Sequence, residues 1–193
     1  MNWTRNGLAR AGLGLALCLW VGTPTLADES AAKVAASDLY AGTLAAGDTE
    51  LSAILARDPD GRLLFVRQWR VPADRALLEV PAGTLDVHDG VIEDPDLAAR
   101  RELEEETGYR ATTWQKLAEF WTAPGFASEL MHLYLADGLT AADADRLGPD
   151  EDEHLELERL TLSDALAKVD DGSIADAKSI VGLLWLDRME RRR

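Results

Sequence analysis

The chain has 193 residues, of which 47% are hydrophobic, and carries a formal net charge of -15. This length suits one domain after removal of a targeting segment, and the apolar content supports a packed core, which excludes wholesale disorder. The acidic balance disfavours nucleic acid or an anionic membrane as the partner. Acidic clusters can instead collect divalent cations, and these can bridge to phosphates.

The N-terminal segment has the pattern of a secretory signal peptide over residues 1–27. Two arginines precede an apolar run at 11–22, and Thr25 and Ala27 occupy the small positions of a cleavage site. The run is short for a transmembrane helix, although an uncleaved anchor is the alternative. We therefore expect a periplasmic or secreted protein without membrane contact after cleavage, and a cytoplasmic one if the segment is not functional. Cleavage would remove Cys18, the only cysteine.

Residues 28–50 are weakly patterned and indicate a linker, with one short strand near 39–44. The pattern sharpens from Leu51. Two apolar runs flank the turn sequence at 58–61, which predicts a β-hairpin. A third strand at 75–86 runs into a Pro-Gly loop.

A helix is expected next, with Asp94 as N-cap, Pro95 at its first position and Gly108 at its end. Beyond it the sequence predicts three strands, the last with leucines alternating against charges, and two amphipathic helices: 113–125, 129–138, 154–160, 162–169 and 174–189. This order of elements predicts an α/β fold, a mixed β-sheet sandwiched between helices (α/β/α).

The expected helix carries an unusual density of carboxylates. At 3.6 residues per turn, Glu102, Glu105 and Glu106 share one face, whereas Glu104 points elsewhere and is expected to be solvated. Leu103 can face the core. Like charges on one face repel, and a Mg²⁺ ion held by oxygen ligands would explain them. The alternative is an exposed acidic helix neutralised by the neighbouring cations Arg100, Arg101 and Lys116.

The flanks of this helix resemble the signature of the Nudix hydrolase family. That signature is a glycine, five residues, a glutamate, seven residues, then Arg-Glu-aliphatic-x-Glu-Glu-x-Gly-aliphatic. Here Glu93 precedes the matching stretch 101–109, in which Tyr109 takes the final position. Nine residues instead of five separate Gly83 from Glu93. We interpret Val87–Gly90 as a lengthening of this loop that leaves the helix intact.

The resemblance covers about residues 50–187 and points to the ADP-ribose pyrophosphatase branch. "LLEVPAGTLD", "APGFASELMHLYLA" and the C-terminal "GPDEDEHLELERL" are similar to segments of that branch. It implies the Nudix fold over residues 51–193, and it assigns the metal ligands, with Arg101 orienting the glutamates. The implied ligands are Glu102, Glu105, Glu106 and the Ala82 carbonyl.

The resemblance also places the general base on an acidic loop, at Glu151. Glu153 matches a glutamate that approaches the metals, and Asp152 or Glu153 could replace Glu151 as the base. A solvated loop over Asp150–Glu153 is the alternative from the residues alone.

Substrate contacts are implied at two pairs of residues, Arg70 with Glu79 and Ser128 with Glu129. Trp69 could stack on a base, although a lone aromatic beside a strand is more often part of the core. His132, within an apolar strand, is expected to be a satisfied core histidine rather than a catalyst.

The implied reaction is Mg²⁺-dependent hydrolysis of ADP-ribose to AMP and ribose 5-phosphate, with Mn²⁺ as an alternative ion. UDP-, ADP- or GDP-sugars are alternative substrates, and a non-catalytic nucleotide-sugar-binding module is the alternative from another class. Members of this branch use a longer N-terminal β region to form a dimer. The corresponding region before Leu51 is short here, so a homodimer is one of two alternatives for this chain.

Overall fold

The computed structural model describes residues 49–142 and 155–192. The expected signal peptide, the short strand near 39–44 and the acidic loop at Asp150–Glu153 lie outside the described residues. All of the elements below belong to one compact unit of the chain, Ala45–Arg193.

A mixed seven-stranded sheet forms the centre of this unit. Five of its strands lie side by side in the order β3-β2-β1-β8-β7, and the other two pair beside this path. β4 pairs with β1 and β9 pairs with β2, both antiparallel. β1 and β8 run parallel over nine paired residues, which makes the sheet mixed. The strands are β1 (Thr49–Arg57), β2 (Leu63–Arg70), β3 (Arg75–Glu79), β4 (Ala82–Thr84), β7 (Tyr109–Trp121), β8 (Glu129–Ala141) and β9 (Glu156–Leu160).

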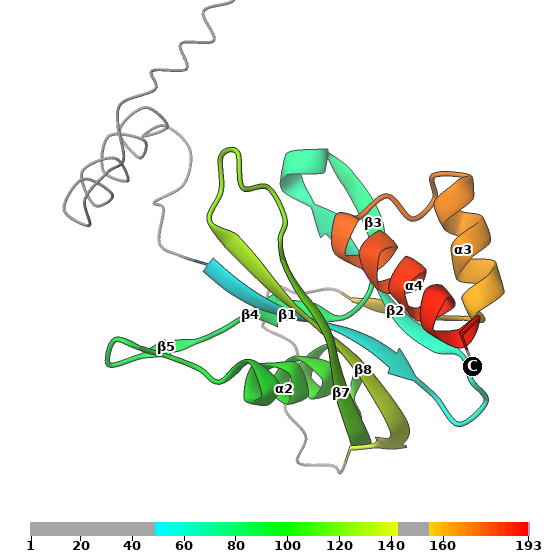
Figure 1. Cartoon of the computed structure of the whole chain (residues 1–193), viewed down its shortest axis with the longest axis horizontal. Coiled ribbons are helices and arrows are strands. Elements are labelled where there is room, and N and C mark those ends of the chain that lie inside the picture. Colours follow the sequence, from blue (N-terminus) through cyan, green and yellow to red (C-terminus); the bar gives the residue numbers. More distant parts are fainter. Residues whose placement is uncertain (1–48, 143–154, 193) are drawn as a thin grey trace, which may run out of the picture. The chain divides into compact units, whose positions relative to one another are not determined.

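Helices cover both faces of the sheet, as Figure 1 shows: α2 (Pro95–Thr107) lies on one face, and α3 (Leu162–Asp170) and α4 (Ala177–Glu190) lie on the other. Two clusters of buried side chains match these layers. Leu103 of α2 packs with Ile54 and Tyr134, while Leu183 of α4 packs with Leu55 and Leu133. The predicted α/β/α fold is therefore confirmed.

The two predicted local signals at the start of the domain are also confirmed. In the β1–β2 turn the Asp58 carboxylate accepts hydrogen bonds from the backbone N–H groups of Asp60 and Arg62. In α2, Asp94 caps the first turn by accepting from Asp96 and Leu97. Gly108 ends the helix in the left-handed region at φ 70°, where glycine is favoured.

The lengthened loop forms a small β-hairpin, β5 (Val87–His88) paired with β6 (Val91–Ile92). Asp89 and Gly90 turn it with positive φ values of 52° and 79°, as a two-residue hairpin turn requires. The arm extends away from the sheet in Figure 1. Its base is closed by a hydrogen bond from the Glu93 N–H to the Asp86 carbonyl.

The predicted last strand is present as β9. Leu157 on this strand is 40% exposed. β9 pairs only with β2, at the edge of the sheet. Only Leu160 packs against the core among the leucines of β9.

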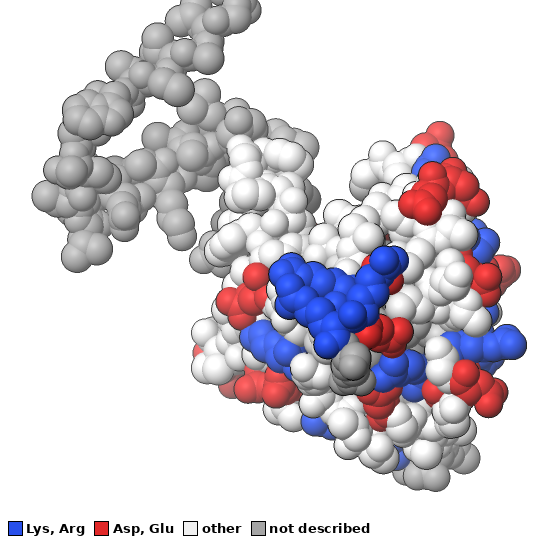
Figure 2. Space-filling view, turned by 45° about the vertical axis from the view of Figure 1, so that its right-hand side comes forward, with Lys and Arg blue, Asp and Glu red and all other residues white. Residues whose placement is uncertain are grey.

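The surface charge is unevenly distributed. Figure 2 shows a face on which basic side chains gather into a patch beside acidic ones, although the whole chain carries -15. Among the described helices, none is long and apolar enough to cross a membrane.

Candidate active site

The acidic face of α2, formed by Glu102, Glu105 and Glu106, lies against β4, while Leu103 on a neighbouring part of the helix surface packs into the core. The Glu106 carboxylate accepts a hydrogen bond from the backbone N–H of Ala82 at 3.0 Å. The Glu102 carboxylate lies directly over Gly83, where an added Cβ would come within 1.9 Å of its Cδ. Glycine is therefore required at 83 for Glu102 to occupy this place. Glu102 and Glu106 therefore both lie against the Pro-Ala-Gly segment at 81–83.

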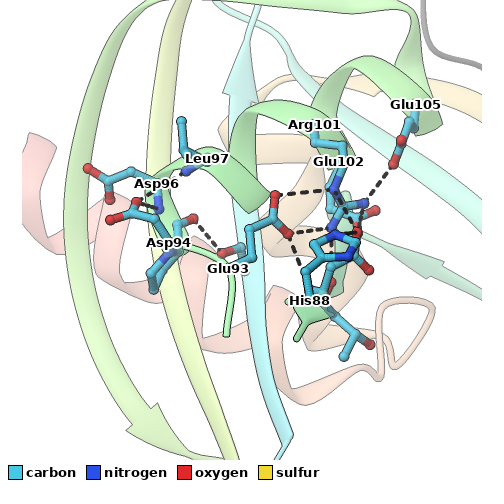
Figure 3. A network of polar contacts seen from close by, with 12 residues as sticks. His88, Glu93, Asp94, Asp96, Leu97, Arg101, Glu102 and Glu105 are labelled. Atoms are coloured by element: carbon cyan, nitrogen blue, oxygen red, sulfur yellow. Dashed lines mark hydrogen bonds and ion pairs between the residues drawn. The ribbon is translucent and has the colours of Figure 1, made fainter. Parts of the chain in front are cut away.

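Arg101 organises this face by contacting several carboxylates at once (Figure 3). Its Nη1 donates to Glu102 at 2.7 Å and to Glu105 at 2.8 Å. Its Nη2 donates to Glu93 at 2.9 Å and to the Thr84 carbonyl at 3.0 Å. Arg101 thus joins the carboxylate helix to β4 and to the end of the β5–β6 arm.

The electrostatics keep these groups charged. Burial alone would lower the pKa of Arg101, but hydrogen bonds and charge from Glu93, Glu102 and Glu105 raise it far above its ordinary value. Burial alone would raise the pKa of Glu93, but the hydrogen bond from Arg101 brings it below its ordinary value. The contact between Arg101 and Glu93 therefore joins a permanent cation to an ionised carboxylate.

The chemistry of the donor set fits a hard divalent cation, because Glu102, Glu105 and Glu106 are all oxygen ligands. Within residues 49–142 and 155–192, however, no three His, Cys, Asp or Glu side chains are grouped closely enough to hold a metal ion. Here the Glu102 and Glu105 carboxylates contact Arg101, and the Glu106 carboxylate contacts the Ala82 N–H. These three side chains could hold a divalent metal ion.

The expectation for Glu104 is wrong. Its side chain is 10% exposed, and its two carboxylate oxygens each accept from Arg110 at 2.6 Å. A fork of this kind is stronger than a solvated charge because both hydrogen bonds are charge-assisted. Glu104 therefore fixes α2 to the start of β7.

The alternative of a neutralised acidic helix named three cations: Arg100, Arg101 and Lys116. They contact different partners. Arg100 lies over the ring of Trp114, 4.9 Å from its centroid. Lys116 donates to Glu119 on its own strand at 2.8 Å. Of the three, Arg101 is the cation whose contacts fall on the acidic face.

Arg70 and Glu79, the implied substrate contacts, bond to each other. Arg70 Nε and Nη2 donate to the two carboxylate oxygens of Glu79, both at 2.8 Å. Glu79 also accepts from Lys178 Nζ, and Lys178 lies 3.1 Å from Asp176. Sequence reasoning did not find Lys178 or Asp176, because they follow Glu79 by almost a hundred residues.

This cluster is adjacent to the carboxylate helix. The backbone N–H of Val80 donates to Ser179 Oγ at 2.9 Å, which fastens α4 to the segment that leads into Ala82. The hydrogen bond to Glu79 raises the pKa of Arg70, and the charges of Asp176 and Glu106 act in the same direction. The Arg70 guanidinium therefore interacts electrostatically with Glu106 of the acidic face.

The remaining implied substrate residues lie at the start of β8 and the end of β2. The Ser128 carbonyl accepts from the Thr49 N–H, and the Glu129 carboxylate accepts from Thr122 at 2.6 Å. Trp69 is not part of the core, since it is 59% exposed. Its ring is therefore available to a ligand.

His132 is buried, as expected, with its side chain 5% exposed. Its Nε2 lies 2.7 Å from Glu50, and its Nδ1 lies 3.2 Å from Glu119 without the geometry of a hydrogen bond. It therefore bridges β8 to β1 and β7, but its Nδ1 lacks a hydrogen bond, so the expected satisfied core histidine is confirmed only in its burial. Glu151 and Glu153 lie outside the described residues.

Comparison with known proteins identifies the class to which this fold and site belong. The sequence model of the NUDIX domain matches residues 50–180. The chain is 41% identical over 138 residues to an ADP-ribose pyrophosphatase of Bacillus subtilis, covering 72% of each chain. It is 38% identical over 130 residues to a GDP-mannose pyrophosphatase of Cronobacter sakazakii, covering 64% of this chain and 65% of the relative.

A solved structure shares the fold. The crystal structure of an ADP compounds hydrolase superimposes with a TM-score of 0.66 at 25% identity, covering 76% of this chain and 75% of that one. The chain therefore belongs to the NUDIX domain family and is a Nudix hydrolase.

Proposed function

We propose that this protein hydrolyses the pyrophosphate linkage of nucleoside diphosphate sugars in a Mg²⁺-dependent reaction. ADP-ribose, cleaved to AMP and ribose 5-phosphate, is the leading substrate. The observation that carries the proposal is the acidic face of α2, which lies against β4 and is organised by Arg101. The name of the Bacillus subtilis relative supports ADP-ribose, and that of the Cronobacter relative supports a GDP-sugar as the second candidate.

The reaction must overcome repulsion, because both phosphates of the linkage are negative. A divalent ion bound by Glu102, Glu105 and Glu106 would neutralise this charge and lower the pKa of a water molecule. The protein's own task is to hold these carboxylates in place. Arg101 does this through its contacts with Glu102 and Glu105.

Proton transfer is assigned to Glu151 by its matching position in the ADP-ribose pyrophosphatase branch. A carboxylate there can take the proton of the attacking water as the P–O bond to the leaving phosphate breaks. Arg70, half-exposed beside the acidic face, offers its remaining N–H groups to a phosphate oxygen. The exposed ring of Trp69, the residue before it, offers a stacking face to the base.

The non-catalytic alternative is less well supported. A binding module has no need for three carboxylates on one helix face, and their mutual repulsion would select against them. The buried Glu106 and the glycine that makes room for Glu102 indicate a face built for these side chains.

A product assay of the purified protein tests the proposal. A panel of ADP-ribose and ADP-, GDP- and UDP-sugars is incubated with Mg²⁺, Mn²⁺ or a chelator, and the nucleotide products are resolved by chromatography. We expect a nucleoside monophosphate and a sugar phosphate, formed only when the ion is present. If no substrate of the panel is cleaved with either ion, the proposal is wrong.

We also propose that the protein is exported after cleavage of residues 1–27, on the pattern of charge, apolar run and small residues in the sequence. N-terminal sequencing of protein from the native cell envelope tests this. A chain that begins near Asp28 is expected. An intact Met1 in the cytosolic fraction would contradict export.

A further inference from the structure

A second charged cluster lies where the start of α4 meets the end of β3. Glu79 is 1% exposed and accepts hydrogen bonds from both Arg70 and Lys178. Lys178 is itself 8% exposed and also lies 3.1 Å from Asp176. A buried ammonium group is costly unless its partners compensate it, so this lysine has a specific role in the cluster.

Several hydrogen bonds hold the backbone around this cluster. Asp176 caps α4 by accepting from the backbone N–H and the Oγ of Ser179, at 3.0 and 2.6 Å. Ser179 Oγ in turn accepts from the N–H of Val80, directly after Glu79. The start of α4 is thereby fixed to the segment that leads to Ala82, so the carboxylates of Glu79 and Asp176 keep their places.

We infer that Lys178 is a positioning residue for substrate binding: by compensating Glu79 and Asp176, it leaves the charge of Arg70 available to a phosphate of the substrate. The inference rests on the proposed function and assigns a role to a residue of α4, on the other face of the sheet from the acidic helix. Its basis is that two cations face two carboxylates in this cluster.

Without Lys178, Arg70 would be the single cation of this cluster, opposed by both carboxylates. The guanidinium already feels the charge of Asp176. The guanidinium would move toward the two carboxylates, and their charge would neutralise its own. It would then attract a phosphate of the substrate less strongly. With Lys178 present, the Glu79 fork holds the guanidinium in a fixed plane, and its half-exposed edge remains directed to solvent.

The first test is Lys178→Met, which keeps the length of the side chain and removes its charge. KM for the best substrate of the panel should rise about tenfold, the effect of one hydrogen bond to a charged group, while kcat stays within about twofold. The Mg²⁺ concentration for half-maximal rate should not change. The matched control is Lys168→Met, which removes a lysine whose partner, Glu158, is 3.6 Å away on the sheet edge; its KM should match wild type.

A second pair of variants separates charge compensation from packing. Asp176→Asn retains a good N-cap and should lower KM about two- to threefold, because it releases Arg70 from one carboxylate. The double variant Lys178→Met/Asp176→Asn restores the balance of one cation and one carboxylate, so its KM should return toward wild type. If Lys178 had only a structural role, the KM of the double variant would be at least as high as that of Lys178→Met.

The outcomes distinguish this inference from the proposed function. If wild-type protein cleaves the panel but Lys178→Met leaves KM unchanged, the inference is wrong and the function stands. A failed rescue in the double variant, or an unchanged or raised KM in Asp176→Asn, also overturns the inference. If Lys178→Met does not fold, Asp176→Asn and the double variant still decide it. If wild-type protein cleaves nothing, both the function and the inference fall.

Discussion

The acidic face of α2 and the Glu79 cluster both set carboxylates against cations, yet their charge balance differs. On α2 a single guanidinium, that of Arg101, contacts Glu93, Glu102 and Glu105. In the Glu79 cluster, two cations face two carboxylates. In the first arrangement the carboxylates outnumber the guanidinium, which fits the proposed divalent cation, whereas in the second the cations and carboxylates are equal in number and compensate each other. We therefore propose that contacts of the same kind serve a bound ion at one place and a fixed geometry at the other.

The comparison is tested most strongly at the two glutamates that face β4. Glu102→Gln and Glu106→Gln should each reduce kcat by roughly 10³–10⁵-fold, because a ligand of the bound ion supplies several kcal/mol of charge stabilisation. The melting temperature without Mg²⁺ should hold or rise, since one like charge is removed from the face. Steady-state kinetics and thermal melting measure the two effects. Near-normal turnover in both variants would overturn the metal assignment.

Glu104→Gln is the matched control on the same helix. Its carboxylate is committed to Arg110 rather than to the acidic face. The variant should keep its Mg²⁺ dependence and its kcat but unfold more easily, by about 1–3 kcal/mol, because a largely buried acceptor of two charge-assisted bonds is weakened. If Glu104→Gln lost as much turnover as Glu106→Gln, Glu104 would not be separate in function from the acidic face of α2.

The fold and the carboxylate helix could be predicted because their signals are local. Asp94, Pro95 and Gly108 mark the ends of α2 through capping chemistry that depends on a few neighbouring residues. The shared face of Glu102 and Glu106 follows from helical spacing alone. The turn at 58–61 likewise depends on the side chain of Asp58 and its immediate neighbours.

What could not be predicted depends on partners distant in sequence. Glu104 was expected in solvent because nothing near it within the helix indicates Arg110 on the next strand. Lys178 meets Glu79 across 99 positions, through the packing of α4 on the sheet. Each of these is decided by tertiary packing.

The next prediction concerns the base, which belongs to neither cluster. Glu151→Gln should lower kcat by roughly 10²–10⁴-fold, since the amide keeps the size of the side chain but cannot accept a proton. KM and the Mg²⁺ requirement should remain nearly unchanged, in contrast to the glutamates of α2. Kinetics over a series of Mg²⁺ concentrations separate the two behaviours.

Neighbouring variants locate the base within its loop. Glu153→Gln is expected to raise the Mg²⁺ concentration for half-maximal rate, and Asp152→Asn is expected to change little. If Glu151→Gln, Asp152→Asn and Glu153→Gln all keep full kcat on ADP-ribose, the base lies elsewhere and the assignment of this loop is wrong.

The smallest expected effect is on acid stability, and it compares the two clusters directly. Burial alone would raise the pKa of Glu79, but the hydrogen bond from Arg70 and the charge of Lys178 bring it below the ordinary value of 4.5. A lowered pKa means that the folded protein binds fewer protons than the unfolded chain. The stability it contributes is therefore present above pH 4.5 and is lost as the pH falls through the folded-state pKa.

Urea unfolding at neutral pH and in acid measures this contribution. Wild-type protein should lose unfolding free energy as the pH falls below 4.5, and Glu79→Gln should lose less over the same interval because it has no such proton to take up. Glu93→Gln, which removes a carboxylate that contacts Arg101, should also reduce the loss of unfolding free energy in acid, but by a smaller amount. The Glu93 side chain is 16% exposed against 2% for Glu79, so solvent screens its contact more. Equal profiles in wild type and Glu79→Gln would show that the compensated cluster, unlike the acidic face, is not held by ionised groups.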